Sequence, residues 1–533
     1  MASQASAAAT AAAIRPEITT PDSVETRLGT LEYNDGAPST KTIAKVYDNL
    51  DLMHAVEAFL HAYQGASTSA IRNGLISAGV PDNAVLIFSK LMDAQSLFLT
   101  ANADTIYFWS VLDLTGGPIV VETPPMSLGV IDDMWFHWVT DFGLPGPDRG
   151  AGGKYLLLPP GYTGDLPDGG FIVERVRTTR AIMLGRAFLD ENDEPGPPVE
   201  LIKKTLKIYP YQPGGYGTSI GTALAGTASL RRTPEGHLDW SFLKPQPAAT
   251  FIEGSGLVMD TIPPNDASYY ELINELVQQE PAGALDPEIM GSLAAIGIVK
   301  GKPFKPDARM RKILTEAAAI ATATTRTLNW RARESEGFAY YPGSAWLNYL
   351  FVGGYTFETP PAQVSPDGVV TPCPPTGYRT LHPRAAMFFY ATGITPAMIM
   401  RLTEIGSEYL GAFTDSTGEY LHGSQTYKLT LPPDIPAARF WSLTIYDNQT
   451  RSMLRTSQRY PRAGSQSYPT PAAAADPEGS TTVYFGPAKP EGVEDGNWIQ
   501  TIPDKGWNTL FRLYSPLQPF FDKTWRPGEI EPI

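Results

Sequence analysis

Ile119-Val-Val-Glu-Thr, Tyr155-Leu-Leu-Leu and Phe171-Ile-Val-Glu-Arg-Val are short runs rich in β-branched and apolar residues. Glycine and proline separate them, as in Thr115-Gly-Gly-Pro and Pro159-Pro-Gly. Such runs between turn residues are typical of antiparallel strands. Similar runs return near the C-terminus, at Tyr427-Lys-Leu-Thr-Leu, Arg439-Phe-Trp-Ser-Leu-Thr-Ile-Tyr, Thr481-Thr-Val-Tyr-Phe and Leu510-Phe-Arg-Leu-Tyr.

The chain between these two groups of strands has helical periodicity. Apolar residues recur at helical spacing before Gln279, and an alanine-rich run extends from Asp307 to Thr327. The sequence predicts a mostly β protein with some α, in which a helical segment joins two β-sandwich or jelly-roll-like domains. We expect a flexible segment at residues 1–40, an N-terminal β-rich domain with a leading helix at 41–262, a helical linker at 263–335 and a C-terminal β-sandwich-like domain at 336–533.

The composition of the chain argues against several classes of partner and cofactor. The 533 residues include 41 basic and 56 acidic ones, a net charge of −15 that disfavours nucleic acids and anionic membranes as partners. No apolar run is long enough to span a membrane and no signal peptide is visible, so we expect a soluble protein. The sequence does not distinguish between a cytoplasmic, a periplasmic and a secreted protein. The single cysteine excludes an intrachain disulfide. The sequence contains no glycine-rich phosphate-binding motif, so we expect no nucleotide cofactor.

Several motifs resemble a two-domain family of unknown function. Asn102-Ala-Asp-Thr-Ile-Tyr and Gly117-Pro-Ile-Val-Val-Glu-Thr-Pro resemble the N-terminal domain of unknown function DUF1254. Phe440-Trp-Ser-Leu-Thr-Ile-Tyr-Asp and Phe511-Arg-Leu-Tyr-Ser-Pro resemble its usual C-terminal partner, DUF1214. The resemblance implies two sandwich-like domains and implies no particular reaction. Where relatives have Leu-Asp-Gly, this chain has Leu421-His-Gly, so His422 replaces an acidic residue.

Asn102, Asp104 and Tyr107 form the first candidate site. On a regular strand, Asn102 and Asp104 share one face and Tyr107 lies on the other. A paired amide and carboxylate can bind a hydroxyl group, a water or a hard cation. An Asx turn, in which these side chains cap their own backbone, is an equally good explanation of the pair.

The second candidate is the run from Asp132 to Asp141. If the run is one strand, Asp133, Trp135 and His137 share a face, and the carboxylate can orient the imidazole as a general base or supply metal ligands with it. A polar pair without catalytic function on a sheet is the alternative.

A third candidate is the strand that begins at Arg439. Alternation places Arg439 and Trp441 on one face and Tyr446 on the other, with hydroxyl and aromatic groups that could line a cleft. A sheet core anchored by tryptophan is the alternative.

These candidates predict an enzyme that acts on a small neutral or apolar molecule by acid–base hydrolysis or elimination. Asp104, Asp133 and His137 would be catalytic, with Asn102, Tyr107, Trp135, Arg439, Trp441 and Tyr446 binding the substrate. A divalent cation such as Mg²⁺ or Ca²⁺ is a candidate cofactor. The chain could also form a homo-oligomer. The alternatives are a non-catalytic module that binds carbohydrate or protein, and a metal-dependent oxidoreductase, which would need at least two histidines near a carboxylate.

Overall fold

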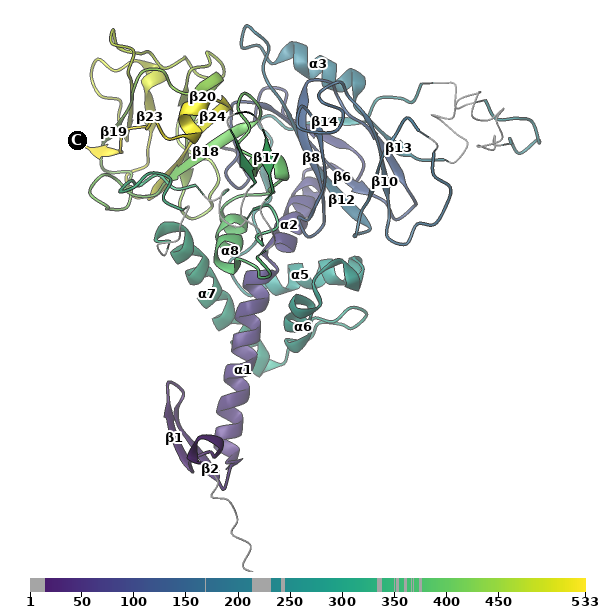
Figure 1. Ribbon diagram of the computed structural model, residues 1–533, viewed down its shortest axis with the longest axis vertical. Helices are drawn as coiled ribbons and strands as arrows, with labels where there is room; N and C mark the ends of the chain where they lie inside the picture. The colour runs from purple at the N-terminus through teal and green to yellow at the C-terminus, as the bar shows by residue number, and fades with distance from the viewer. Residues whose placement is uncertain are drawn as a thin grey trace, which may run out of the picture.

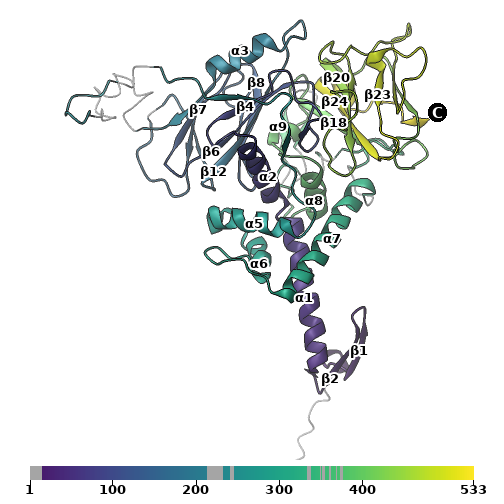
Figure 2. The same ribbon diagram turned by 180° about the vertical axis from the view of Figure 1, so that it is seen from behind.

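The computed structural model describes residues 15–167, 169–212, 232–240, 245–332, 338–348, 350, 354–358, 362–365, 367, 369–372 and 376–533. Two β-rich domains lie side by side, and helices pack below and between them (Figures 1 and 2). The prediction of a mostly β protein with two sheet-rich domains and additional helices is therefore confirmed. No helix of the described residues is long and apolar enough to cross a membrane.

The N-terminal domain contains two sheets that pack face to face. Side chains from both sheets, among them Phe108, Val121 and Leu157, share one apolar core. The six-stranded sheet has the order β14 (Phe251–Glu253), β4 (Val85–Ile87), β6 (Ile106–Asp113), β12 (Arg180–Ala187), β8 (Ser127–Asp133), β9 (Trp138–Gly143). The four-stranded sheet has the order β11 (Ile172–Arg175), β10 (Lys154–Leu158), β7 (Ile119–Glu122), β13 (Lys207–Pro210), and α3 (Gly196–Thr205) leads into β13.

The C-terminal domain also contains two four-stranded sheets. Leu443 and Phe511 from one sheet and Leu429 and Phe485 from the other belong to the same buried cluster. The first sheet has the order β18 (Ser407–Ala412), β24 (Trp507–Pro516), β20 (Ala437–Asp447), β21 (Arg462–Gly464). The second has the order β23 (Trp498–Gln500), β22 (Thr481–Gly486), β19 (Tyr427–Leu431), β25 (Glu531–Pro532).

Helices connect and support the two domains. Asp307 caps the longest of them by accepting a hydrogen bond from the Met310 amide, as expected of an aspartate at a helix start. The helices are α1 (Thr40–His61), α2 (Tyr63–Ser77), α5 (Ser268–Gln279), α6 (Pro287–Ala295), α7 (Ala308–Trp330), α8 (Leu381–Tyr390), α9 (Pro396–Ile399) and α10 (Gln518–Phe521). Short strand pairs are β5 (Ser96–Leu97) with β15 (Met259–Asp260), and β16 (Gln363–Val364) with β17 (Val370–Thr371).

Part of the segment expected to be flexible is folded. Within residues 1–40, the described part contains β1 (Ser23–Thr26), β2 (Gly29–Asn34) and β3 (Ala37–Pro38), which form a small antiparallel sheet at the tip of α1 (Figure 1). The Thr42 hydroxyl on α1 donates to the Glu32 carbonyl and accepts from the Glu32 amide. These bonds attach the small sheet to the helix, a long-range contact that local composition does not reveal.

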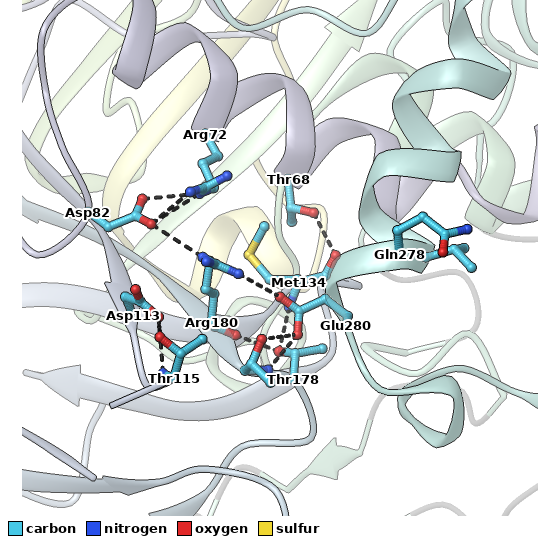
Figure 3. Close-up of polar contacts among 12 residues, drawn as sticks. Thr68, Arg72, Asp82, Asp113, Thr115, Met134, Thr178, Arg180, Gln278 and Glu280 are labelled. Atoms are coloured by element: carbon cyan, nitrogen blue, oxygen red, sulfur yellow. Dashed lines mark hydrogen bonds and ion pairs between the residues drawn. The ribbon is translucent and has the colours of Figure 1, made fainter. Parts of the chain in front are cut away.

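A polar network fastens the helices to the N-terminal sheet (Figure 3). Asp82 accepts hydrogen bonds from Arg72 on α2 at 2.8 Å and from Arg180 on β12 at 3.2 Å. Glu280, directly after α5, accepts from the Thr179 hydroxyl at 2.8 Å and lies 3.8 Å from Arg180 Nη1. Because Arg180 contacts both carboxylates, it links α2 and α5 to the same sheet.

Candidate functional site

One face of the six-stranded sheet is turned toward the C-terminal domain. Arg186 on β12 pairs with Tyr107 on β6, and Val130 on β8 pairs with both Leu184 on β12 and Asp141 on β9. Directly paired residues point to the same face, and so do residues two apart on one strand. Tyr107, Arg186 and Asp141 therefore share the face.

A sheet of the C-terminal domain presents the opposite wall. Tyr409 on β18 pairs with Arg512 on β24, which in turn pairs with Ser442 on β20. Ser407 and Tyr514 form the neighbouring pair on the same face. The Ser442 hydroxyl donates to Asp104 of the N-terminal domain at 2.7 Å, so this face is turned toward the first sheet.

Two adjoining cavities lie between these walls. Their volumes are about 170 and 120 Å³, and α8, α9 and the segment between them close one side. Pockets for drug-sized ligands start at about 300 Å³, so these cavities fit a small molecule rather than a polymer. Apolar groups, such as Trp109, Leu184 and Leu510, form most of the lining. Both cavities are lined by Phe98, Tyr107, Thr392, Met398 and Tyr409.

Tyr409 lies at the junction of the two cavities. Its hydroxyl accepts a hydrogen bond from Arg186 Nη1 at 3.3 Å, and Arg186 Nη2 donates to the Ser407 hydroxyl at 2.9 Å. Burial raises the pKa of the Tyr409 phenol, but the guanidinium groups of Arg186 and Arg512 outweigh burial and hold the pKa below its usual value. The phenol is thus a better proton donor than an ordinary tyrosine.

Arg512 lines the smaller cavity and is only 2 % exposed. Its Nη2 donates to the Thr100 carbonyl at 2.7 Å, while Nε and Nη1 have no hydrogen-bond partner in the described part of the chain. The guanidinium carbon lies 5.8 Å from the ring centre of Tyr409 and 5.7 Å from that of Tyr446. A buried cation with unused N–H groups is a strong donor for an anion or carbonyl oxygen.

Asp141 lines the larger cavity and titrates near neutrality. Burial raises its pKa to about 7, although hydrogen bonds involving Thr395, Trp138 and the Ala397 backbone act in the opposite direction. Asp132 lies nearby, and burial together with the charges of Asp133 and Asp141 raises its pKa well above the usual range. A carboxyl group that is about half protonated at neutral pH suits general acid–base catalysis.

Asp104 lies outside both cavities and joins the two domains. It is fully buried; its Oδ1 lies 2.7 Å from Arg462 Nε, and its Oδ2 accepts hydrogen bonds from Ser442 at 2.7 Å and Tyr514 at 2.9 Å. Residues 101–105 are not a strand, and the side-chain Oδ1 of Asn102 accepts hydrogen bonds from the Asp104 and Thr105 amides. The expected strand pair is therefore wrong, and the Asx turn is correct. Both oxygens of Asp104 are already engaged with protein groups, which leaves a cation no evident place there.

Asn102 and Tyr107 do line the smaller cavity. The Asn102 amide donates to the Tyr107 hydroxyl at 2.7 Å, and burial raises the pKa of this phenol. Their assignment to substrate binding stays a prediction.

The structure brings Asp133 and His137 together, but at a hairpin rather than on one strand. Asp133 ends β8, and its Oδ2 lies 3.0 Å from His137 Nδ1 and 3.3 Å from Arg177 Nε. Its Oδ1 accepts hydrogen bonds from the Trp135 and His137 amides. Phe136 has a positive φ of 50°, so the chain turns here and the alternation expected from Asp133 to His137 fails. Neither residue lines a cavity.

The remaining predicted residues lie outside the cavity walls. Trp135 and Trp441 are buried in the apolar core, and Arg439 packs over Phe188 at 4.4 Å from its ring centre. The Tyr446 hydroxyl donates to the Ala101 carbonyl at 2.6 Å, which connects β20 to the N-terminal domain. His422 also lines neither cavity, and its Nδ1 lies 2.7 Å from the Ser424 hydroxyl.

Sequence reasoning missed Arg186, Tyr409 and Arg512. A usable signal existed for the arginines, since each is a charge inside an apolar strand, as in Leu510-Phe-Arg-Leu-Tyr. A long charged side chain at such a position is either snorkelling to solvent or held in a buried polar site. Asp141 closes the run that begins at Asp132, but its distance from the aspartate–histidine pair drew attention away from it.

Comparison with known families agrees with this two-domain arrangement. The family "Protein of unknown function (DUF1254)" matches residues 83–210, and "Protein of unknown function (DUF1214)" matches residues 406–518. Residues 83–210 are thus similar to DUF1254 and residues 406–518 to DUF1214. Tyr107, Asp141 and Arg186 come from the first matched region, and Tyr409 and Arg512 come from the second. The cavities are thus built by both domains together.

Two solved structures are similar to this chain. A protein from Vibrio parahaemolyticus is similar over 91% of this chain and 100% of its own, with 16% identity and a TM-score of 0.50. A protein from Burkholderia cenocepacia covers 92% of this chain and 96% of its own, with 12% identity and a TM-score of 0.36. A comparison with curated proteins found no match. At 16% identity, the likeness to the Vibrio parahaemolyticus protein concerns the fold alone.

Metal coordination receives no support from the described residues. Among them, no group of three or more His, Cys, Asp or Glu side chains is arranged to hold a metal ion. We therefore assign no residue to a metal.

Proposed function

We propose that this chain is an enzyme that acts on a small, largely apolar molecule held between its two domains. Acid–base hydrolysis or elimination is the reaction type that we propose. The observation that carries the proposal is Asp141, a cavity-lining carboxyl group whose pKa is raised to about 7. A perturbed pKa in a mostly apolar cavity is typical of functional sites.

The residues that line the cavities can carry out separate steps of such a reaction. In a hydrolysis, ionised Asp141 takes a proton from water as the water oxygen attacks the carbonyl carbon of the substrate. The tetrahedral intermediate then breaks its bond to the alkoxide leaving group, which takes the proton from Asp141 and restores the carboxylate. In an elimination, Asp141 takes the proton from carbon while the leaving group departs with its bonding electron pair. In either case the Tyr409 hydroxyl, supported by Arg186, can donate a hydrogen bond to the oxygen that gains negative charge.

The first experiment measures turnover against pH. We expect a panel of small esters, lactones and β-substituted acids and ketones to contain a substrate for the purified chain. If Asp141 is the base, kcat/KM rises with pH through about 7. Replacing it in Asp141→Asn is expected to lower kcat by at least about 100-fold, because the base is lost while the shape is kept.

The matched control is Asp165→Asn, which changes an exposed aspartate that lines neither cavity. It should keep wild-type kcat and the same pH profile. An Asp141→Asn variant with wild-type turnover would contradict the acid–base assignment. Binding of panel members without turnover would instead favour the alternative, a non-catalytic binding module.

A further inference from the structure

The interface between the domains contains more positive than negative charge. Arg462 and Arg512 lie close to the Asp104 carboxylate, and Arg186 lies beside Tyr514, which donates to Asp104. The larger cavity is also lined by Asp141, whose pKa burial raises to about 7, and by Glu408, whose pKa burial raises well above its usual range, so these two carboxyl groups only partly balance the arginines at neutral pH. Arg462 forms the ion pair with Asp104 at 2.7 Å. The partners of Arg186 and Arg512 within the described residues are hydroxyl groups and backbone carbonyls, all of them neutral.

A surplus of buried charge is costly unless an anion balances it. Removing a guanidinium from water is energetically unfavourable, and neutral hydrogen-bond partners compensate for only part of that cost. Arg512 has unused N–H groups on Nε and Nη1, so its hydrogen-bonding capacity is also incomplete. The lowered pKa of Tyr409 reports the same positive potential at the junction of the cavities. Charge and hydrogen bonding therefore both favour a negative group in this place.

The lining decides which anion fits best. Around Arg512 the smaller cavity is formed mainly by Leu347, Leu350, Met387 and Leu510. Six lining side chains carry a hydroxyl or amide group, but the Asn102 amide already donates to Tyr107 and the Tyr390 hydroxyl to Asn508. A phosphate has more oxygens to satisfy and usually a second negative charge, whereas a carboxylate needs fewer donors and leaves room for an apolar body.

We propose that the molecule held between the domains is a small organic acid, with its carboxylate on Arg512 and its apolar body against Phe98 and Met398. The inference rests on the proposed function only in using the same cavities. It adds a substrate class, namely monocarboxylic acids with an aromatic or aliphatic body.

The test compares acids with neutral molecules of the same shape. Phenylacetate and octanoate, and their amides phenylacetamide and octanamide, are titrated into the full chain by calorimetry, with melting temperature as a second readout. We expect each acid to bind at least about tenfold more tightly than its amide, because a charge-assisted hydrogen bond is worth more than a neutral one. Inorganic phosphate is titrated alone and is expected to bind more weakly than phenylacetate.

Arg512→Gln should abolish the preference for acid over amide. The matched control is Arg309→Gln, which removes an exposed arginine paired with Asp48 and Asp51 and should keep the full preference. If Arg512→Gln does not fold, wild-type crystals soaked with 4-bromophenylacetate decide the case. The bromine signal should then place the carboxylate within hydrogen-bonding distance of Arg512.

Four results would overturn the inference. These are equal affinity for acids and amides, a preference that survives Arg512→Gln, phosphate binding more tightly than the acids, and a bromophenylacetate seated elsewhere or not bound. Acid binding together with no turnover of any ester, lactone, β-substituted acid or ketone in the panel would overturn the enzyme proposal and leave this inference standing. Turnover of neutral molecules without any preference for acids would overturn this inference and leave the enzyme proposal standing. The two proposals can therefore be tested separately.

Discussion

At the scale of single residues, Asp141 couples the cavity to the stability of the fold. Burial raises its pKa from the usual 3.8 to about 7. The folded state therefore holds this proton more tightly than the unfolded chain does. The stability contributed in this way is fully present below pH about 4 and is lost as the pH rises through about 7. The folded protein is therefore less stable when Asp141 is ionised than when it is protonated.

Asp141→Asn should remove that cost. A pKa rise of this size corresponds to about 4 kcal/mol, so at pH about 8 the variant should be more stable than the wild type by up to that amount. At pH about 4 the two should unfold alike. Urea unfolding at both pH values checks this, with Asp165→Asn as the variant that should behave like the wild type. Equal pH dependence in Asp141→Asn and wild type would mean that Asp141 titrates normally.

At the scale of elements, close packing of α2 depends on one glycine. A Cβ on Gly65 would lie 2.4 Å from the Trp135 ring and 2.6 Å from Leu276. The glycine lets α2 approach both α5 and the β8–β9 hairpin that contains Trp135. Gly291 on α6 has nothing within 4 Å of such a Cβ, so the same substitution there meets no obstacle.

Gly65→Ala and Gly291→Ala should therefore have opposite effects. We expect Gly65→Ala to lower the free energy of unfolding by about 1–3 kcal/mol, because a buried ring must move. Gly291→Ala should raise it by up to about 1 kcal/mol, because alanine favours a helix more than glycine does. Chemical denaturation followed by circular dichroism measures both. A stabilising Gly65→Ala would show that α2 is not packed as closely as described.

At the scale of the whole molecule, Asp104 joins the two domains. It lies in the N-terminal domain, while Arg462, Ser442 and Tyr514, its three partners, lie in the C-terminal domain. Asp104 and Arg462 are both fully buried, so water cannot replace either partner. The walls of the cavities thus hold their relative position partly through this contact.

Asp104→Asn should destabilise the whole chain. Removing one partner of a buried ion pair costs about 3–5 kcal/mol, because the other charge stays buried and unpaired. The comparison is Asp495→Asn, which breaks an exposed pair with Lys489 and should cost less than about 1 kcal/mol. Calorimetric melting distinguishes the two variants. Similar melting temperatures for both would show that the buried pair does not hold the domains together.

Local sequence patterns predicted where helices and strands form better than they predicted which side chains are buried. Val46, Leu50 and Met53 recur every three to four residues and lie on α1, yet these side chains are 39%, 40% and 52% exposed. The buried residues of α1 are Thr42, Ala55, Ala58 and Phe59. Periodicity reports which residues share a face. It does not report whether another element covers that face.

The sequence by itself determined the β-rich class, the helical segment between the strands and the two-domain family, because strand and helix patterns and motif order are local properties of the chain. Only the tertiary structure decided the candidate site. Tyr107 and Arg186 meet Tyr409 and Arg512 across more than two hundred residues, through the register of two sheets and their face-to-face placement. Burial, which raises the pKa of Asp141 and leaves Arg512 with unused donors, likewise depends on what packs around a side chain. No spacing within a single strand contains that information.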